Sequence, residues 1–230
     1  MMKNKKKGFF SEVAGILQNK DNTVNPAIFN DALALEIDWQ PLQPQGESIM
    51  THELTAVSGH RLQFMPTSGL YVFTGFLIIF GLIFLTFGAL TGFNLMPYVN
   101  NSNLPEPLPS ILFIAMGSLI LYYSISRIRK YFAPMVFDDQ EGYFWRGKEM
   151  PKWHERHDED DFSIPFSRIH AIQILSEYVS ARHSYHSYEI NLVLKNGSRV
   201  PLIDHSVKRS IISDAERLGR FIGVPVWSAI

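Results

Sequence analysis

The sequence predicts an α+β membrane protein: a hairpin of two transmembrane helices, then a sheet-rich C-terminal domain that ends in an amphipathic helix. Three observations predict this class. Two long apolar runs carry no charge, short apolar segments punctuated by turn residues follow them, and the last part of the chain has helical spacing. Only 19% of the 230 residues are charged, below the ~25% of an ordinary soluble domain.

Composition and motifs exclude several classes of protein. The chain has no Cys, which excludes disulfides, cysteine nucleophiles, Fe–S clusters and thiolate zinc sites. A net charge of −1 provides no basic field for nucleic acid, so no nucleic-acid partner is expected. The sequence contains no GxSxG, GxGxxG or GxxxxGK[ST] motif. We therefore expect a protein that is not an enzyme, with no catalytic residues, no cofactor and no metal.

The two spans are expected at about residues 71–96 and 108–126. No Asp, Glu, Lys or Arg occurs between Arg61 and Glu106, or from Pro107 to Ser126. A helix over residues 71–96 would be about 39 Å long, enough to cross a hydrocarbon core of ~30 Å with tilt. The polar, proline-rich stretch around residues 97–110 predicts a short loop between antiparallel helices, because proline interrupts a helix interior.

Basic residues flank the spans on one side only. The loop between the spans has no Lys or Arg, so the positive-inside rule predicts that both termini face the cytoplasm. The residues expected at the membrane interface are basic or are amphipathic tryptophans: Lys5, Lys6, Lys7, Arg127, Arg129, Lys130, Trp145 and Trp153.

The spans themselves contain no Asp, Glu, Lys, Arg or His. This disfavours a transporter, a pump or an intramembrane protease, because those proteins place ionisable groups in the membrane. Gly81, Gly88 and Gly92 share one face of the first span, and small residues let another helix approach closely. The partner is either the second span of the same chain or a helix of another protein.

Residues 132–230 have the length of one small domain and a mostly β pattern. Strands are expected at 134–138, 143–146, 162–166, 169–176, 186–194 and 198–204. Asn196-Gly197 predicts a type I′ hairpin turn. Residues 206–222 predict an amphipathic helix that ends at Gly223, and the apolar tail 224–230 is expected to pack back onto the domain.

Four motifs give the chain a family resemblance. They are VFDD at 136–139 with GYF at 142–144, IPFSRI at 164–169, YEINLVLKNG at 188–197 and DAERLGRFIGVP at 214–225. After two spans, this series resembles the small bacterial membrane proteins that carry a cytoplasmic pleckstrin-homology-like (PH-like) domain. The resemblance covers about residues 70–230. It implies an antiparallel β-barrel closed by a C-terminal amphipathic helix, no common enzymatic activity, and a scaffold role in a bacterial cytoplasmic (inner) membrane.

The expected organisation has three parts: a cytoplasmic N-terminal segment (1–68), a transmembrane hairpin (69–131) and a cytoplasmic PH-like domain (132–230). The N-terminal segment is too small to bury a core alone, yet it contains Phe29, Trp39 and Phe64. The PH-like domain, the bilayer surface or a partner should cover these rings. Residues 26–36 predict a helix with Asn25 as its N-cap.

The expected function is that of a membrane-anchored scaffold or accessory subunit of a larger inner-membrane complex. Its partners would be other membrane proteins or further copies of the chain, together with the phospholipid bilayer. The alternative is a membrane-bound, metal-dependent hydrolase. His154 and His157 precede an acidic run at 158–161, and imidazole and carboxylate groups are metal ligands.

Overall fold

The computed structural model describes residues 24–93, 108–150, 163–180 and 183–230. The described chain divides into two compact units, one formed by residues up to Met65 and from Met135 onward, the other by Pro66–Pro134. The second unit is the helical hairpin. The first, here the β unit, joins the N-terminal segment to the C-terminal strands, so residues 24–65 are not a separate part of the molecule.

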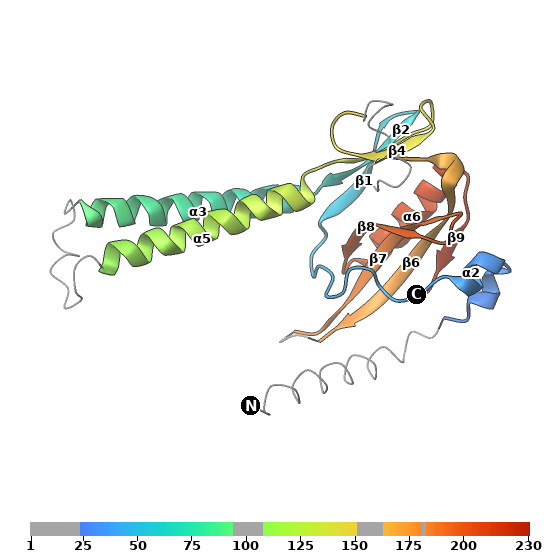
Figure 1. The fold of residues 1–230 in the computed structure, drawn as a ribbon, viewed down its shortest axis with the longest axis horizontal. Coiled ribbons are helices and arrows are strands. Elements are labelled where there is room, and N and C mark those ends of the chain that lie inside the picture. Colours follow the sequence, from blue (N-terminus) through green and yellow to red (C-terminus); the bar gives the residue numbers. More distant parts are fainter. Residues whose placement is uncertain (1–23, 94–107, 151–162, 181–182) are drawn as a thin grey trace. The chain divides into compact units, whose positions relative to one another are not determined.

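The hairpin consists of α3 (Ser68–Gly92) and α5 (Leu108–Tyr131) (Figure 1). Both helices are long and apolar enough to cross a membrane, and only 17% and 22% of their most apolar windows are buried inside the structure. The first helix starts and ends a few residues before the predicted span, with Thr67 capping Leu70. The second continues beyond the predicted end at Ser126 into its basic last turn.

The strands of the β unit form two sheets. The first sheet has the order β1-β2-β3-β4-β5, and its members are His52–Ser58, Arg61–Pro66, Met135–Asp138, Tyr143–Arg146 and Ser163–Pro165. The second has the order β8-β7-β6-β9, formed by Arg199–His205, Tyr185–Leu194, Ile169–Val179 and Val226–Ser228. In the described residues the two sheets do not close into a barrel, so the barrel implied by the family resemblance is not confirmed.

The hairpin is inserted between two neighbouring strands. β2 and β3 pair antiparallel from Arg61↔Asp138 to Phe64↔Met135, although the whole hairpin separates them in sequence. The Arg61 Nη2 and Asp138 Oδ2 atoms are 2.7 Å apart. Burial alone would raise the pKa of Asp138, but the Glu141 amide and the Arg61 guanidinium outweigh it and lower this pKa below its ordinary value. Residues 61–66, directly before α3, thus form a paired strand.

Helix α6 (Lys208–Ile222) covers the main core. Its Ile211, Ala215 and Leu218 are fully buried against apolar residues of both sheets. The helix ends at Gly223, where φ is 82°, a left-handed value that glycine adopts without strain. The tail then returns as β9, which pairs parallel to β6 from Ile172↔Val226 to Ile174↔Ser228. The expected amphipathic helix and packed tail are both present.

The β7–β8 hairpin is present, but its predicted turn type is wrong. Among the described residues other than glycine, only Asn30 and Gln45 have positive φ, whereas a type I′ turn requires it at both central positions. Gly197 has φ of 84°, its amide donates to the Leu194 carbonyl, and the Leu194 amide donates to the Ser198 carbonyl. The loop is therefore a three-residue connection in which glycine alone takes the left-handed position.

Residues 24–50 cover the other face of the second sheet. A 3-10 turn η2 (Pro26–Phe29) and a short helix α2 (Ala32–Glu36) replace the single helix expected at 26–36, although Asn25 does cap the first of them. Phe29 stacks on Trp39 at a centroid distance of 5.2 Å, and both rings lie near Trp227 of β9. Of the three expected covers for these rings, the β unit itself is the one observed.

Candidate functional site

The predicted glycine face of α3 is used inside the hairpin. A Cβ added at Gly88 would lie 2.7 Å from Ile114 Cγ1, and one added at Gly81 would lie 2.9 Å from Leu121 Cδ2. Gly92 is the loosest of the three, with its nearest atom 3.4 Å away on Ser110. Helix α5 contributes Gly117, which the sequence analysis did not select. These contacts leave the second span of the same chain as the observed partner.

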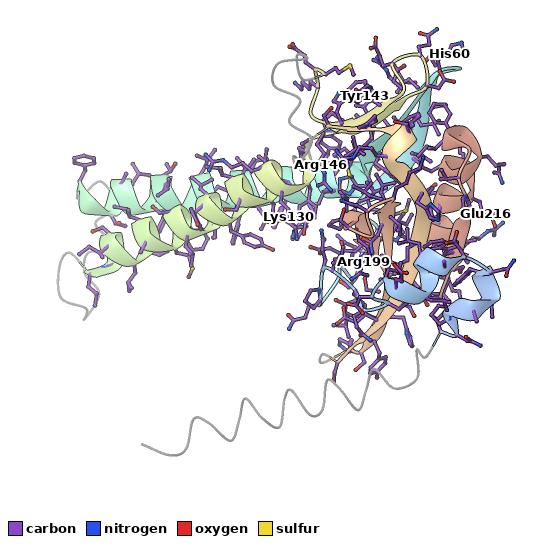
Figure 2. The ribbon with its side chains drawn as sticks, turned by 45° about the vertical axis from the view of Figure 1, so that its right-hand side comes forward. His60, Lys130, Tyr143, Arg146, Arg199 and Glu216 are labelled. Atoms are coloured by element: carbon purple, nitrogen blue, oxygen red, sulfur yellow. The ribbon has the colours of Figure 1, made fainter. Side chains whose placement is uncertain are left out.

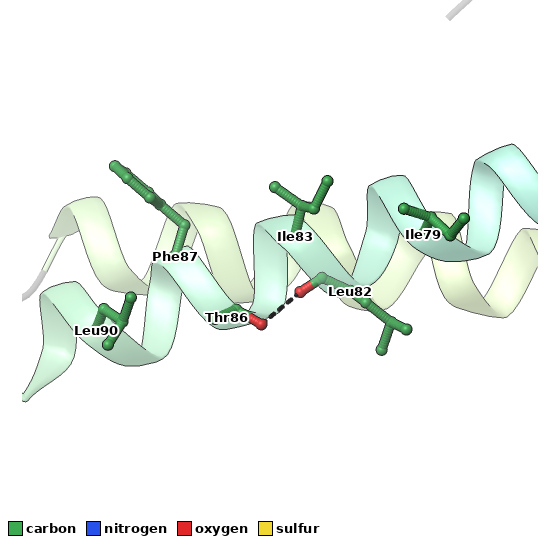
Figure 3. A pocket seen from close by; sticks show the side chains of 6 residues that line it. All are labelled: Ile79, Leu82, Ile83, Thr86, Phe87 and Leu90. Atoms are coloured by element: carbon green, nitrogen blue, oxygen red, sulfur yellow. Dashed lines mark hydrogen bonds between the residues drawn. The ribbon is translucent and has the colours of Figure 1, made fainter.

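The opposite flank of α3 has a shallow apolar hollow of about 350 Å³ (Figure 3). Ile79, Leu82, Ile83, Thr86, Phe87 and Leu90 line it. The one polar group there, the Thr86 hydroxyl, donates to the Leu82 carbonyl at 2.9 Å. Apart from this hydroxyl, which is bonded within the helix, the hollow is apolar, a character compatible with contact to lipid.

The basic end of α5 is rich in aromatic contacts. The Arg127 guanidinium lies 4.9 Å from the Tyr131 ring centroid and within 6 Å of the Phe73 and Tyr123 rings. Arg129 and Lys130 are exposed, and Figure 2 labels Lys130. The Lys130 Nζ atom lies 4.7 Å from the Tyr131 ring centroid. Arginine and aromatic rings together are typical of the membrane–water boundary.

The other expected interface residues behave differently. Trp145 is only 2% exposed, and Arg61 lies over its ring, so in this structure it is a packing residue of β4 and does not present its indole at a surface. Lys5, Lys6, Lys7 and Trp153 lie outside the described residues. So do His154 and His157 of the alternative metal site. Within the described part of the chain, no group of three or more His, Asp or Glu residues could hold a metal ion.

The polar face of the second sheet was missed by the sequence analysis. Residues 38–50, here called the strap, contain no helix or strand and run across β6, β7 and β8 (Figure 1). Polar residues alternate with apolar ones along β7, at Ser187, Glu189 and Asn191. This pattern is typical of a strand with one face toward solvent. The strap instead buries all three, to 3% exposure or less.

Side chains of this face bind the main chain of the strap. The Glu189 carboxylate accepts hydrogen bonds from the amides of Leu42 (2.9 Å) and Gln43 (2.7 Å), and Glu177 accepts one from Gln45 (2.9 Å). The bonds in the other direction run to strap carbonyls. These bonds are donated by Gln173 to Asp38, by Arg199 to Gln40, by Tyr185 to Gly46 and by Ser206 to Ser48. Arg199 is labelled in Figure 2.

Two buried titratable groups lie under β1. Asp214 of α6 accepts a hydrogen bond from the Leu54 amide, and Arg217 donates to the Leu54 carbonyl at 3.0 Å. The two side chains thus satisfy both backbone groups of one edge-strand residue. Burial raises the pKa of Asp214 to about 6, against the lowering effect of Leu54 and Arg217.

The second group is His205, which is fully buried. Its Nδ1 accepts from the Val207 amide at 3.1 Å, so the neutral ring carries its proton on Nε2, which has no hydrogen-bond partner. Burial lowers the pKa of His205 to about 4, and the neighbouring His52 contributes to the shift.

No protein-family model matches this sequence. A comparison with curated proteins finds no significant relative.

Replacing Gly117 by Ala should weaken the hairpin. The new Cβ would lie 2.8 Å from the Gly81 carbonyl oxygen and 2.8 Å from the Leu85 amide nitrogen, and neither backbone atom can turn aside. We expect a loss of about 1–3 kcal/mol, measured as earlier unfolding of the helices in mixed micelles of rising SDS fraction. Gly75→Ala is the matched control, because a Cβ there meets nothing within 4 Å. Equal transitions for the two variants would contradict the close helix contact.

Replacing Asp214 by Asn should remove a fall in stability at rising pH. The folded state holds the Asp214 proton up to about pH 6, whereas the unfolded chain releases it near 3.8. The free energy of unfolding therefore decreases by about 3 kcal/mol as pH rises from 4 to 6. Asn keeps an acceptor for the Leu54 amide and does not titrate. Urea unfolding followed by tryptophan fluorescence measures the effect. If the free energy of unfolding of the variant fell with pH as steeply as that of the unmodified protein, the prediction for Asp214 would be refuted.

Replacing His205 by Asn should remove a fall in stability at decreasing pH, the reverse of the Asp214 effect. The unfolded chain binds a proton near pH 6.5, while the folded state resists it down to about 4. This histidine therefore lowers stability as pH falls through that window, by about 3 kcal/mol. The Asn Oδ1 can still accept from Val207. We expect a smaller loss of stability between pH 6.5 and 4 than in the unmodified protein, in the same urea experiment.

Proposed function

We propose that this protein is a membrane-anchored, non-enzymatic scaffold or accessory subunit of a membrane protein complex. The hairpin is its anchor, and the β unit is a PH-like interaction domain. One observation carries the proposal: α3 and α5 expose long apolar surfaces and are inserted between two strands that pair with each other. A buried core helix of a soluble protein would have most of that surface covered.

The β2–β3 pairing supports a topology in which both ends of the hairpin lie on the same side of the membrane. Hydrogen-bonded strands cannot lie on opposite sides of a bilayer, so the chain must leave and return on the same side. Arg127, Arg129 and Lys130 follow the second span directly, and the positive-inside rule makes that side the cytoplasm. With the family resemblance, the proposed location is the cytoplasmic membrane of a bacterium.

The scaffold role is supported by the chemistry of the two units. Over their described lengths the spans contain no Asp, Glu, Lys, Arg or His before Arg127, and conduction or intramembrane catalysis usually requires such groups. The strand order followed by a closing amphipathic helix supports a PH-like domain. Polar side chains of its second sheet, such as Glu189 and Arg199, bind the main chain of the strap. A surface that binds an extended main chain is what a binding module requires.

The test is membrane extraction followed by a native mass measurement. The protein should stay with membranes through carbonate washing and, after mild detergent, run in a particle heavier than one chain. Ile83→Lys should reduce membrane retention, because a lysine at the middle of a span costs about 2.5–3.5 kcal/mol. Glu216→Lys, at a similarly exposed position of α6, is the matched control. Release of the unmodified protein by carbonate would refute the anchor, and a monodisperse single chain would refute the scaffold.

A further inference from the structure

The face beneath the strap has more hydrogen-bonding groups than the strap uses. Ser187 Oγ and Asn191 Oδ1 have no hydrogen-bond partner, although these residues are 3% and 0% exposed. Ser187 faces the strap, since a Cβ added at Gly46 would lie 2.2 Å from its Oγ. Asn191 belongs to the same face, because its amide donates to the Glu189 carboxylate at 2.6 Å. Buried groups left unpaired in this way each cost about 1–3 kcal/mol.

The face is also rich in negative charge. Burial raises the pKa of Glu177, and the charge of Glu189 adds to this rise. The Asp204 and Glu47 charges lie close enough to Tyr185 to act on its hydroxyl together with that of Glu177. Among the described residues, the basic side chain seen to bind this face is that of Arg199, whose guanidinium binds Asp38, Gln40 and Gln173. The strap thus supplies backbone amides to the carboxylates of the face and backbone carbonyls to its donors, and it places no basic side chain against Glu177 or Glu189.

The strap is held by contacts that another chain could replace. Apart from the ion pair between the Asp38 carboxylate and Arg199, its bonds to the polar side chains of the face use main-chain groups, which every polypeptide has. No strand pairing fixes it. Pro41 and Pro44 cannot donate to a sheet ladder. Gln45 has φ of 65°, a left-handed value that costs a residue other than glycine about 1 kcal/mol. Such a segment opens at lower free energy than the sheet it covers.

We propose that the strap is a displaceable cover, and that the β6–β7–β8 face beneath it binds an extended segment of a partner protein bearing lysine or arginine. Main-chain groups of that segment would take over the bonds now made to residues 38–48. Its basic side chains would donate to Glu177, Glu189 and the free Asn191 Oδ1, which the strap leaves without a cationic donor. A phosphate group is a poor occupant because the carboxylates repel it.

This inference deepens the proposed scaffold function by naming the surface and the class of partner. Peptide binding to the detergent-solubilised full chain tests it without reference to membrane retention. Failure of one proposal is therefore distinguishable from failure of the other.

The first measurement is hydrogen exchange on the full-length protein. The amides of Leu42, Gln43 and Gln45 should exchange at least tenfold faster than those of β6 and β7. Gly46→Ala should accelerate them at least tenfold further, because the new methyl group would lie 2.8 Å from both Ser187 Cβ and Asp204 Oδ2. Gly59→Ala is the matched control, since a Cβ there meets nothing within 4 Å. Exchange of strap and sheet amides at one common rate would overturn the displaceable cover.

The second measurement is binding of two fluorescent peptides that copy residues 38–50, one unchanged and one with Gln43→Lys and Gln45→Lys. The lysine peptide should bind Gly46→Ala protein at least tenfold more tightly than Gly59→Ala protein, and more tightly than the unchanged peptide does. Adding Glu189→Gln should abolish that preference. Trp39→Ala, which removes the contact with Phe29, is a second opening variant if Gly46→Ala misfolds. Absence of binding, or equal binding of the two peptides to opened protein, would overturn the proposal.

Discussion

The pairing of β2 with β3 is the constraint on which the rest of the structure depends. It joins residues on either side of the helical hairpin, and its register from Arg61↔Asp138 to Phe64↔Met135 fixes both ends of the insertion. The pair buries Leu62 and Phe64 beside Met135 and Phe137 in the main core. Because the contact is far apart in sequence, the first sheet cannot be completed until α5 has been made and the chain has returned.

A second feature is a sheet with both faces covered. β6 and β7 pack apolar residues such as Ile172, Ile174 and Ile190 toward α6 and the first sheet. Their other face is apolar near Trp227, where η2 and α2 dock, and polar toward Ser187, where the strap lies. The two halves differ in physical character: aromatic stacking and apolar burial hold the first, while side-chain hydrogen bonds to backbone hold the second. In the second half, apart from the Arg199–Asp38 ion pair, the hydrogen bonds use main-chain groups of the covering segment and do not depend on its sequence.

Local patterns predicted most of the regular elements. The charge-free runs located both long helices, and alternation with turn residues located β3, β4 and the β6–β8 strands within a few residues. The errors came where local preference and tertiary contact compete. Trp145 is of the amphipathic residue type that anchors proteins at a membrane interface, but it is buried in β4. The Asn196-Gly197 pair lies in a three-residue loop because the flanking strands set the register. Residues 52–58 carry a mixed pattern that pairing with β2 resolves into a strand.

The amino-acid sequence by itself determined the two apolar helices, their basic flank and the amphipathic helix α6, because charge, hydropathy and helical spacing are properties of contiguous residues. Tertiary structure alone decided that the N-terminal segment belongs to the β unit. The strap groups that bind Glu189, Glu177 and Arg199 lie more than a hundred residues away from them along the chain, and Ser187, Glu189 and Asn191 have the alternation of a solvent face. Only the folded chain, by laying the strap across them, makes that face an interior.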